Sequence, residues 1–186
     1  TIEDPVEYLH PDLRSSVSQR EVGVDTPSFA TALRASLRQD PDVILVGEIR
    51  DEDTMDTALK AAETGHLVLG TLHSSDVQRT INRIMALMSD SEPQEVRERL
   101  ADALEGIVAQ RLVPRADGQG LALVAEVLVA TGTAREAIRA PHANPSLKDI
   151  MEKGVSPYHM QTFDMHYREL VQRGLIDRSH ARGLNL

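Results

Sequence analysis

Asp42-Val43-Ile44-Leu45-Val46-Gly47-Glu48-Ile49-Arg50-Asp51 is the stretch of sequence that decides the predicted fold. Four consecutive aliphatic residues, 43–46, follow Asp40-Pro41-Asp42 and end at Gly47, which is typical of a short strand buried on both faces in a parallel sheet. Glu48 then lies where the strand ends, and open α/β sheets bind their ligands at that edge. A buried strand that runs into a solvated acidic turn has the same pattern, so this stretch alone leaves both interpretations open.

Length and composition describe an ordinary globular protein. The chain has 186 residues, with 20 Lys and Arg against 29 Asp and Glu and a net charge of −9. This balance does not favour binding to nucleic acid or to anionic lipid. No apolar run approaches the roughly 20 residues of a membrane span, and no signal segment is present, so a cytoplasmic location is predicted. The absence of cysteine excludes disulfides and thiolate metal sites.

The first seven residues form a second acidic stretch. Glu3, Asp4 and Glu7 follow the apolar Ile2, and Pro5 prevents a helix from continuing through Asp4. We expect an acidic loop at a strand end, which serves either as a solvated turn or as oxygen ligands for a hard cation. Because the chain starts at what resembles the end of a strand, we expect it to be the C-terminal part of a longer protein.

A second aliphatic strand is predicted over 66–73, with a histidine at each end. His66 and His73 are seven residues apart and point to opposite faces of an extended strand, which argues against a shared zinc site. His73 ends the strand at the same sheet edge as Glu48, where it is expected to contact a phosphate or its nucleophilic water. His66 is expected to be a structural hydrogen-bonding residue.

The remaining elements alternate between strands and amphipathic helices. Strands are predicted over 16–22 and 121–129, the latter in a β pair that ends the sheet, and helices over 28–39, 51–63, 77–87 and 93–112. Beyond Thr131, short helical pieces are predicted over 134–139, 146–152, 162–173 and 178–181. The sequence therefore predicts an α/β core with a parallel sheet over residues 1–131 and a helical C-terminal subdomain over 132–186.

Three stretches, taken in order, resemble the secretion ATPases that drive type II secretion and type IV pili. Residues 1–7 resemble the aspartate box, 42–51 the Walker B segment and 64–73 the histidine box, and Ala109-Gln110-Arg111-Leu112 also resembles this family. The resemblance covers nearly the whole chain and implies a RecA-like P-loop ATPase core. No Gly-x-x-x-x-Gly-Lys-Ser/Thr loop occurs in this sequence. We therefore expect a partial core that lacks the Walker A strand and helix.

The resemblance implies an ATP-hydrolysing motor of type IV pilus dynamics. Such a protein uses ATP and Mg²⁺, forms a homo-hexamer, and acts at the inner membrane on a platform protein and indirectly on pilin. Zero cysteines and the segment 29–41 favour the retraction branch, whose C-terminal signature is present here in the divergent form Thr133–Ile138. The alternatives are a pilus extension or type II secretion ATPase, or a regulatory relative that assembles without hydrolysis. Net charge and the histidine box argue against a DNA-translocating relative.

The resemblance also implies roles for individual residues. Glu48 is expected to orient or deprotonate the attacking water, directly or through Mg²⁺, and Glu7 is the other candidate base. His73 resembles a γ-phosphate sensor, and Asp4 shares with Glu48 the Mg²⁺ and its waters. The expected nucleotide-contacting residues are Glu3, Asp4, Arg50, Asp51, His66 and Arg83. Arg34 and Arg38 are expected to be solvated at the surface, with contact to a phosphate or to a neighbouring subunit as the alternative. The 186-residue chain alone is expected to be inactive.

Overall fold

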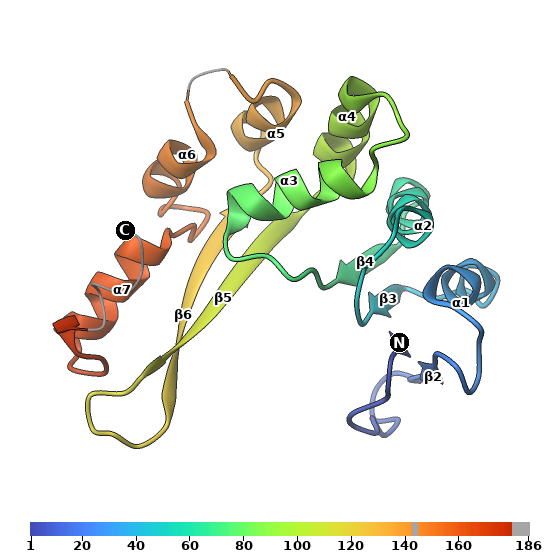
Figure 1. Cartoon of the computed structure of the whole chain (residues 1–186), viewed down its shortest axis with the longest axis horizontal. Helices are drawn as coiled ribbons and strands as arrows, with labels where there is room; N and C mark the ends of the chain where they lie inside the picture. Colours follow the sequence, from blue (N-terminus) through green and yellow to red (C-terminus); the bar gives the residue numbers. More distant parts are fainter. Residues whose placement is uncertain (143–144, 180–186) are drawn as a thin grey trace. The chain divides into compact units, whose positions relative to one another are not determined.

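The computed structural model describes residues 1–142 and 145–179, which divide into two compact units (Figure 1). The first unit contains residues 1–73 and 84–103, and the second contains residues 74–83 and the chain from Leu104 onward. The predicted domain boundary at 131 and 132 lies inside the second unit and stays a prediction. None of the helices in the described part of the chain has the length and apolar character of a membrane span.

The first unit is built on a four-stranded parallel sheet of order β2-β1-β3-β4. The strands are β1 (Ile2–Glu3), β2 (Arg20–Glu21), β3 (Val43–Val46) and β4 (Leu67–Gly70). Val43 pairs with Leu67 and Val46 with Gly70, so β3 and β4 run in register and end together. The predicted α/β class with a parallel sheet is confirmed, although the strand expected over 16–22 is reduced to two residues.

Helices α1 (Phe29–Ser36) and α2 (Glu52–Glu63) pack together, α1 against β1 and β3 and α2 against β4 (Figure 1). Ser28 caps α1, since its hydroxyl accepts from the Thr31 N–H at 3.1 Å. Ile44 and Val46 are buried beneath these helices, whereas the Val43 side chain is 53% exposed. The expectation that β3 is buried on both faces is therefore wrong, because alternate residues of a strand point to opposite faces and helices cover one.

Two glycines allow close approaches at the carboxyl edge of the sheet. The Gly47 N–H donates to the Ile2 carbonyl at 2.8 Å, and a Cβ on Gly47 would lie 2.9 Å from that oxygen. A Cβ on Gly70 would lie 2.6 Å from Ile49 Cδ1. A side chain at either position would force neighbouring atoms apart, so these glycines allow the segments after β1, β3 and β4 to lie close together.

The second unit contains an antiparallel hairpin of β5 (Gly106–Pro114) and β6 (Leu121–Val129), which forms a sheet of its own. The helix predicted over 93–112 is therefore wrong beyond α4 (Pro93–Ala103). Residues 107–113 have the alternating burial of a strand, and cross-strand pairing along nine residues outweighs their local helical pattern. The expectation that this β pair ends the parallel sheet is also wrong.

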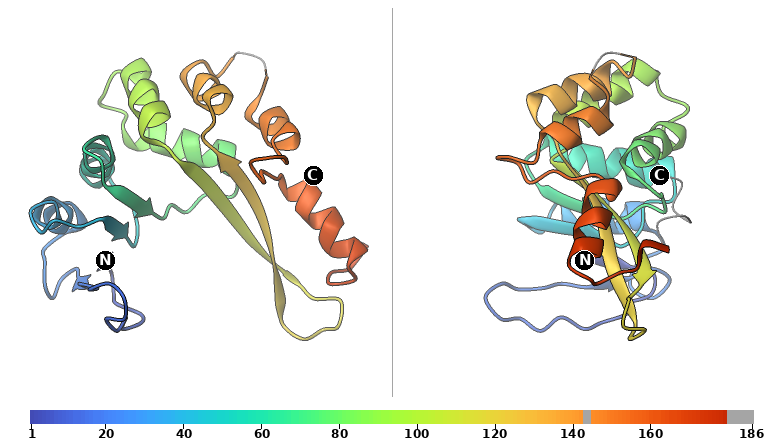
Figure 2. Two further views of the ribbon diagram at one scale, coloured as in Figure 1. Left: turned by 180° about the vertical axis from the view of Figure 1, so that it is seen from behind. Right: turned by 90° about the vertical axis from the view of Figure 1, so that its left-hand side faces the viewer.

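Helix α7 (Phe163–Gln172) packs against one face of the hairpin (Figure 2). Phe163, Tyr167 and Leu170 of α7 form a buried cluster with hairpin residues that include Val113 and Val124. The unit also contains α5 (Gly132–Arg139) and α6 (Leu147–Lys153), as well as residues 77–83 of α3 (Val77–Leu87). Three of the short helices predicted beyond residue 131 are therefore confirmed, and the piece predicted over 178–181 lies partly outside the described residues.

Candidate active site at the edge of the parallel sheet

Glu48 lies two residues beyond β3, and its side chain is only 18% exposed. Its Oε2 is 2.6 Å from Arg50 Nη2, and its Oε1 is 3.3 Å from His73 Nε2. Because β3 and β4 end in register, the segments that follow them leave the same edge of the sheet. The structure thus brings Glu48 and His73 together at the edge where the strand ends predict them.

Arg50 links Glu48 to the acidic loop after β1, since its Nη1 lies 3.4 Å from Asp4 Oδ2. The pKa of Glu48 is held below its usual range by the hydrogen bond from Arg50, with further contributions from the charges of Arg50 and His73. A carboxylate with a lowered pKa is a weak base at neutral pH but a stable anion. Its chemistry suits orienting a water or balancing a cation better than removing a proton.

The other acids of the first loop are arranged differently. Glu3 Oε1 accepts hydrogen bonds from the Thr1 hydroxyl and from Gln19 Nε2, the latter at 3.0 Å. The Thr1 hydrogen bond is the main cause that lowers the pKa of Glu3, and the Gln19 amide and the Glu7 backbone N–H add to it. The Glu7 side chain is exposed. Of the loop acids, the structure ties Asp4 to Glu48 through Arg50 and ties Glu3 to Thr1 and Gln19.

Three further predicted residues lie elsewhere. Asp51 caps α2, since its Oδ1 accepts from the Thr54 N–H at 2.8 Å. His66 precedes β4, at the opposite end of the strand from His73, and its Nδ1 is 3.0 Å from the Ala61 carbonyl oxygen. The structure therefore does not bring His66 to Glu48. Arg83 is exposed on α3 and belongs to the second unit, so its predicted role stays a prediction.

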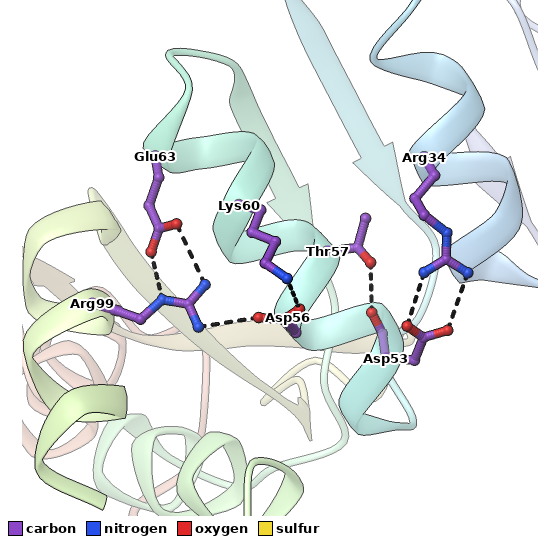
Figure 3. Close-up of polar contacts among 7 residues, drawn as sticks. All are labelled: Arg34, Asp53, Asp56, Thr57, Lys60, Glu63 and Arg99. Atoms are coloured by element: carbon purple, nitrogen blue, oxygen red, sulfur yellow. Dashed lines mark hydrogen bonds and ion pairs between the residues drawn. The ribbon is translucent and has the colours of Figure 1, made fainter. Parts of the chain in front are cut away.

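Surface solvation and contact with a neighbouring subunit are the two roles predicted for Arg34 and Arg38. Arg34 is exposed and pairs with Asp53 of α2, its two Nη atoms lying 2.9 and 3.2 Å from the Asp53 carboxylate (Figure 3). Arg38 is exposed. The Arg34–Asp53 pair joins α1 to α2 within the first unit, and the subunit role of both arginines stays a prediction.

Thr71 is a site residue whose contacts the sequence did not predict. Its hydroxyl donates to the Gly47 carbonyl, and its own carbonyl accepts from the Ile49 N–H at 3.0 Å. These bonds fasten the chain after β4 to the chain that surrounds Glu48. The sequence does show a hydroxyl residue at the end of the strand, two positions before His73. It does not show the acceptor of that hydroxyl, the Gly47 carbonyl, which is 24 residues away.

The donor set around Glu48 is incomplete as a metal site. Over residues 1–142 and 145–179, no three His, Cys, Asp or Glu side chains are grouped to hold a metal ion. Mg²⁺ commonly takes one or two protein carboxylates, with waters and substrate phosphates as its remaining ligands. Glu48 and Asp4 therefore fit a cation that arrives with phosphate groups, and they do not form a full coordination shell by themselves.

The first unit has the fold of an α/β protein with a parallel sheet, and the cluster lies at the carboxyl edge, where proteins of this class bind their ligands. Residues 1–173 match the family of type II/IV secretion system proteins, and the chain belongs to this family. The resemblance to the secretion ATPases is thereby confirmed.

Two relatives and one solved structure are similar to nearly the whole of this chain. It is 42% identical over 182 residues to a twitching motility protein of Neisseria gonorrhoeae. This alignment covers 98% of this chain and 48% of the relative. It is also 42% identical to the type IV pilus retractation ATPase PilT of Pseudomonas aeruginosa, over 98% of this chain and 52% of the relative.

A crystal structure of the pilus retraction motor PilT with bound ADP superposes with a TM-score of 0.83 and 44% identity, over 98% of this chain and 50% of that one. The chain thus spans about half the length of these relatives.

Proposed function

We propose that this chain is the part of a type IV pilus retraction ATPase that supplies the water-orienting carboxylate. The observation that carries the proposal is Glu48, held between Arg50 and His73 at the carboxyl edge of the sheet. Phosphoryl transfer to water requires a group that positions the attacking water and charged or polar groups that contact the γ-phosphate. Glu48 and His73 take these two roles, and Asp4 and Arg50 complete the charge balance.

The phosphate loop belongs to the remainder of a longer protein. This sequence contains no such loop, and the chain matches only about half of each relative. One face of the β3–β4 pair also bears aliphatic side chains that are about half exposed, Val43, Leu67 and Leu69. Parallel sheets normally have both faces covered. The exposed face therefore supports a longer protein in which further chain covers the sheet and cradles the phosphates of ATP.

The lowered pKa of Glu48 supports one of two roles for this residue. A general base works best with a pKa near the operating pH, whereas a fixed anion orients water and attracts cations. We assign Glu48 to orientation of the attacking water. Mg²⁺ bound with ATP would supply neutralising charge on the phosphate oxygens. His73, whose side chain is 88% exposed, is accessible to the γ-phosphate.

The retraction role is supported by the names of the two relatives, one a twitching motility protein and the other a retractation ATPase. We include in the proposal a hexameric ring, a cytoplasmic location at the inner membrane, a platform protein as direct partner and pilin as indirect partner. The resemblance to the family supports these assignments. Nucleic acid is not a partner in this proposal, consistent with the net charge of −9.

The test is Glu48→Gln in the longer protein. We expect nucleotide binding to stay nearly intact while turnover falls by a factor of about a hundred, because the amide keeps the shape and removes the charge. Glu169→Gln, in an exposed pair with Arg173, is the matched control and should leave turnover unchanged. Normal turnover in Glu48→Gln would contradict the proposal and would move the role to Asp4 or Glu7.

Two further measurements separate the parts of the proposal. Calorimetry on the 186-residue chain should show weak or no binding of MgATP, because the phosphate-cradling amides are supplied elsewhere. Micromolar affinity would show that the missing part is dispensable. Cells whose only copy carries Glu48→Gln should keep surface pili and lose twitching. Loss of the pili themselves would assign the protein to pilus extension.

A further inference from the structure

The loop between β1 and β2 carries Asp4 and Glu7, two acids of the candidate active site. Residues 7–16 of this loop are all exposed, so packing against the sheet does little to fix its conformation. Ordering an exposed loop of this length costs conformational entropy. The contacts that oppose this cost are hydrogen bonds, and several of them come from two side chains at β2.

Gln19, the residue before β2, holds the loop at two backbone positions. Its Oε1 accepts from the His10 N–H at 2.7 Å, and its Nε2 donates to the Tyr8 carbonyl at 2.9 Å. The same Nε2 donates to Glu3 Oε1 at 3.0 Å. A side-chain amide offers two N–H donors and a carbonyl acceptor, so Gln19 makes all three bonds with one group. Neither a carboxylate nor an aliphatic side chain could make this set.

Glu21 holds the same loop at a third backbone position, since its Oε2 accepts from the Val6 N–H at 3.0 Å. Residues two apart on an extended strand point to one face, so Gln19 and Glu21 present their side chains together. Val6 meets Glu21 and His10 meets Gln19, so the segment 6–10 runs antiparallel to the chain around β2. Side chains thus take the place of a backbone ladder at this edge of the sheet.

Glu21 also fixes the chain on both sides of Asp4. Before Asp4, Glu3 is the register partner of Glu21 in the pairing of β1 with β2. After Asp4, the Val6 N–H donates to the Glu21 carboxylate. Held between these two points, Asp4 places its Oδ2 3.4 Å from Arg50 Nη1. A shift of the segment 6–10 would therefore move Asp4 relative to the guanidinium that it contacts.

We propose that Gln19 and Glu21 are positioning residues that keep Asp4 against Arg50, and through Arg50 set the carboxylate of Glu48. This inference rests on the proposed function, and all five residues belong to the first compact unit. In this role Glu21 acts as a hydrogen-bond acceptor for a backbone N–H, not as a charge that meets a cation. That difference makes the two roles of Glu21 separable by experiment.

Two substitutions of Glu21 in the longer protein test the proposal. We expect Glu21→Ala to lower kcat about tenfold with little change in KM, because a displaced acidic loop disturbs the alignment of Glu48. Glu21→Gln keeps an acceptor for the Val6 N–H and should keep kcat near that of the unaltered protein. An equal loss in Glu21→Gln would overturn the proposal, since it would show that the charge is what matters.

Asp12→Ala is the matched control, because Asp12 makes the same kind of bond in the same loop. Its Oδ1 accepts from the Val17 N–H at 2.7 Å, away from the segment 6–10. Asp12→Ala should therefore leave kcat unchanged. A tenfold loss in this control would overturn the assignment to Gln19 and Glu21, because any disturbance of the loop would then have the same effect.

A double-mutant cycle tests whether Gln19 acts through Asp4. Gln19→Leu removes the three hydrogen bonds at similar side-chain size, and we expect it to lower kcat about tenfold. In an Asp4→Ala background, Gln19→Leu should cause no further loss, because both changes remove the same contribution. Losses that multiply would overturn the proposal.

Hydrogen exchange of the amides of residues 6–10 gives a readout that does not need ATP hydrolysis. Exchange there should be about tenfold faster in Gln19→Leu and in Glu21→Ala than in the unaltered protein, at unchanged melting temperature, because the altered loop is exposed. Unchanged exchange would overturn the proposal. Faster exchange in these variants, together with no hydrolysis by the unaltered protein, would overturn the proposed function and leave the hold on the loop established.

Discussion

Arg50 donates from one guanidinium to Glu48, at 2.6 Å, and to Asp4, at 3.4 Å. The two acceptors come from segments that follow different strands and are 44 residues apart in sequence. The shorter bond is to the less exposed carboxylate, so Arg50 acts mainly on Glu48. An arginine so placed favours the ionised form of Glu48 and links it to the acidic loop after β1.

Arg50→Ala is expected to shift the pH dependence of hydrolysis. Arg50 holds the pKa of Glu48 below its usual range, so removal of the guanidinium raises that pKa. The carboxylate then takes up its proton at a higher pH as the solution is acidified. The acidic limb of kcat/KM against pH should therefore move to higher pH. Arg173→Ala, which breaks an exposed pair with Glu169, is the control and should leave the acidic limb at its original pH. An acidic limb at its original pH in Arg50→Ala would contradict the assignment of this limb to Glu48.

The two histidines should separate in function. His73→Ala should impair turnover much more than ATP binding, because His73 lies 3.3 Å from Glu48 at the carboxyl edge. His66→Ala should act mainly on stability, since Nδ1 of His66 bonds to the Ala61 carbonyl at the far end of β4. The loss of that half-buried hydrogen bond is worth about 1 kcal/mol. Melting curves and steady-state hydrolysis distinguish the two, and equal loss of turnover with unchanged melting would disprove this separation.

Arg99 is expected to be a stabilising residue of the first unit. From α4 it contacts two acids of α2, with Nη1 3.0 Å from Asp56 and Nε 2.7 Å from Glu63, and its side chain is 21% exposed (Figure 3). Arg99→Ala should lower the free energy of unfolding by about 1 to 2 kcal/mol, because it leaves both acids without this partner. Urea denaturation measures the change. Arg34→Ala, in the exposed pair with Asp53, is the control and should change stability little.

The Arg99 effect should also depend on pH. Burial acts to raise the pKa of Asp56, but hydrogen bonds from Lys60 and Arg99 outweigh it and the pKa is lowered. A group with a lowered pKa stabilises the fold fully above its unfolded pKa, about 3.9 for Asp, and this contribution is lost as pH falls through the folded pKa. The difference between wild type and Arg99→Ala should therefore be full at pH 7 and shrink below about pH 4. A constant difference would show that packing, not charge, is the cause.

Asp117 provides a direct check of the electrostatics of the hairpin turn. Its pKa is lowered from 3.8 to about 2, mainly by the hydrogen bond from Arg115 and also by the Gln119 N–H. A pH titration followed by NMR should show the Asp117 carboxyl signal changing at about pH 2. In Arg115→Ala the transition should move upward toward 3.8. A transition near 3.8 in the unaltered protein would show that the pair is not formed in solution.

The sequence by itself determined the elements whose signals are local. The aliphatic run 43–46 and the residues after it fixed β3 and the place of Glu48, and a similar run fixed β4 and the place of His73. Parallel strands that end in register bring their following residues to one edge, so the meeting of these two side chains followed from the pattern. The family followed from the same stretches, because three motifs in order are specific even without a phosphate loop.

Only the tertiary structure decided the features that depend on distant partners. Residues 106–114 became a strand instead of the end of a helix because they pair with 121–129, and a local helical period does not contain that pairing energy. His66 was separated from the site by the length of β4. Arg111 found its acceptor at Ser75, 36 residues earlier. Short windows encode caps and periodicity, whereas hydrogen bonds between remote segments depend on how the whole chain packs.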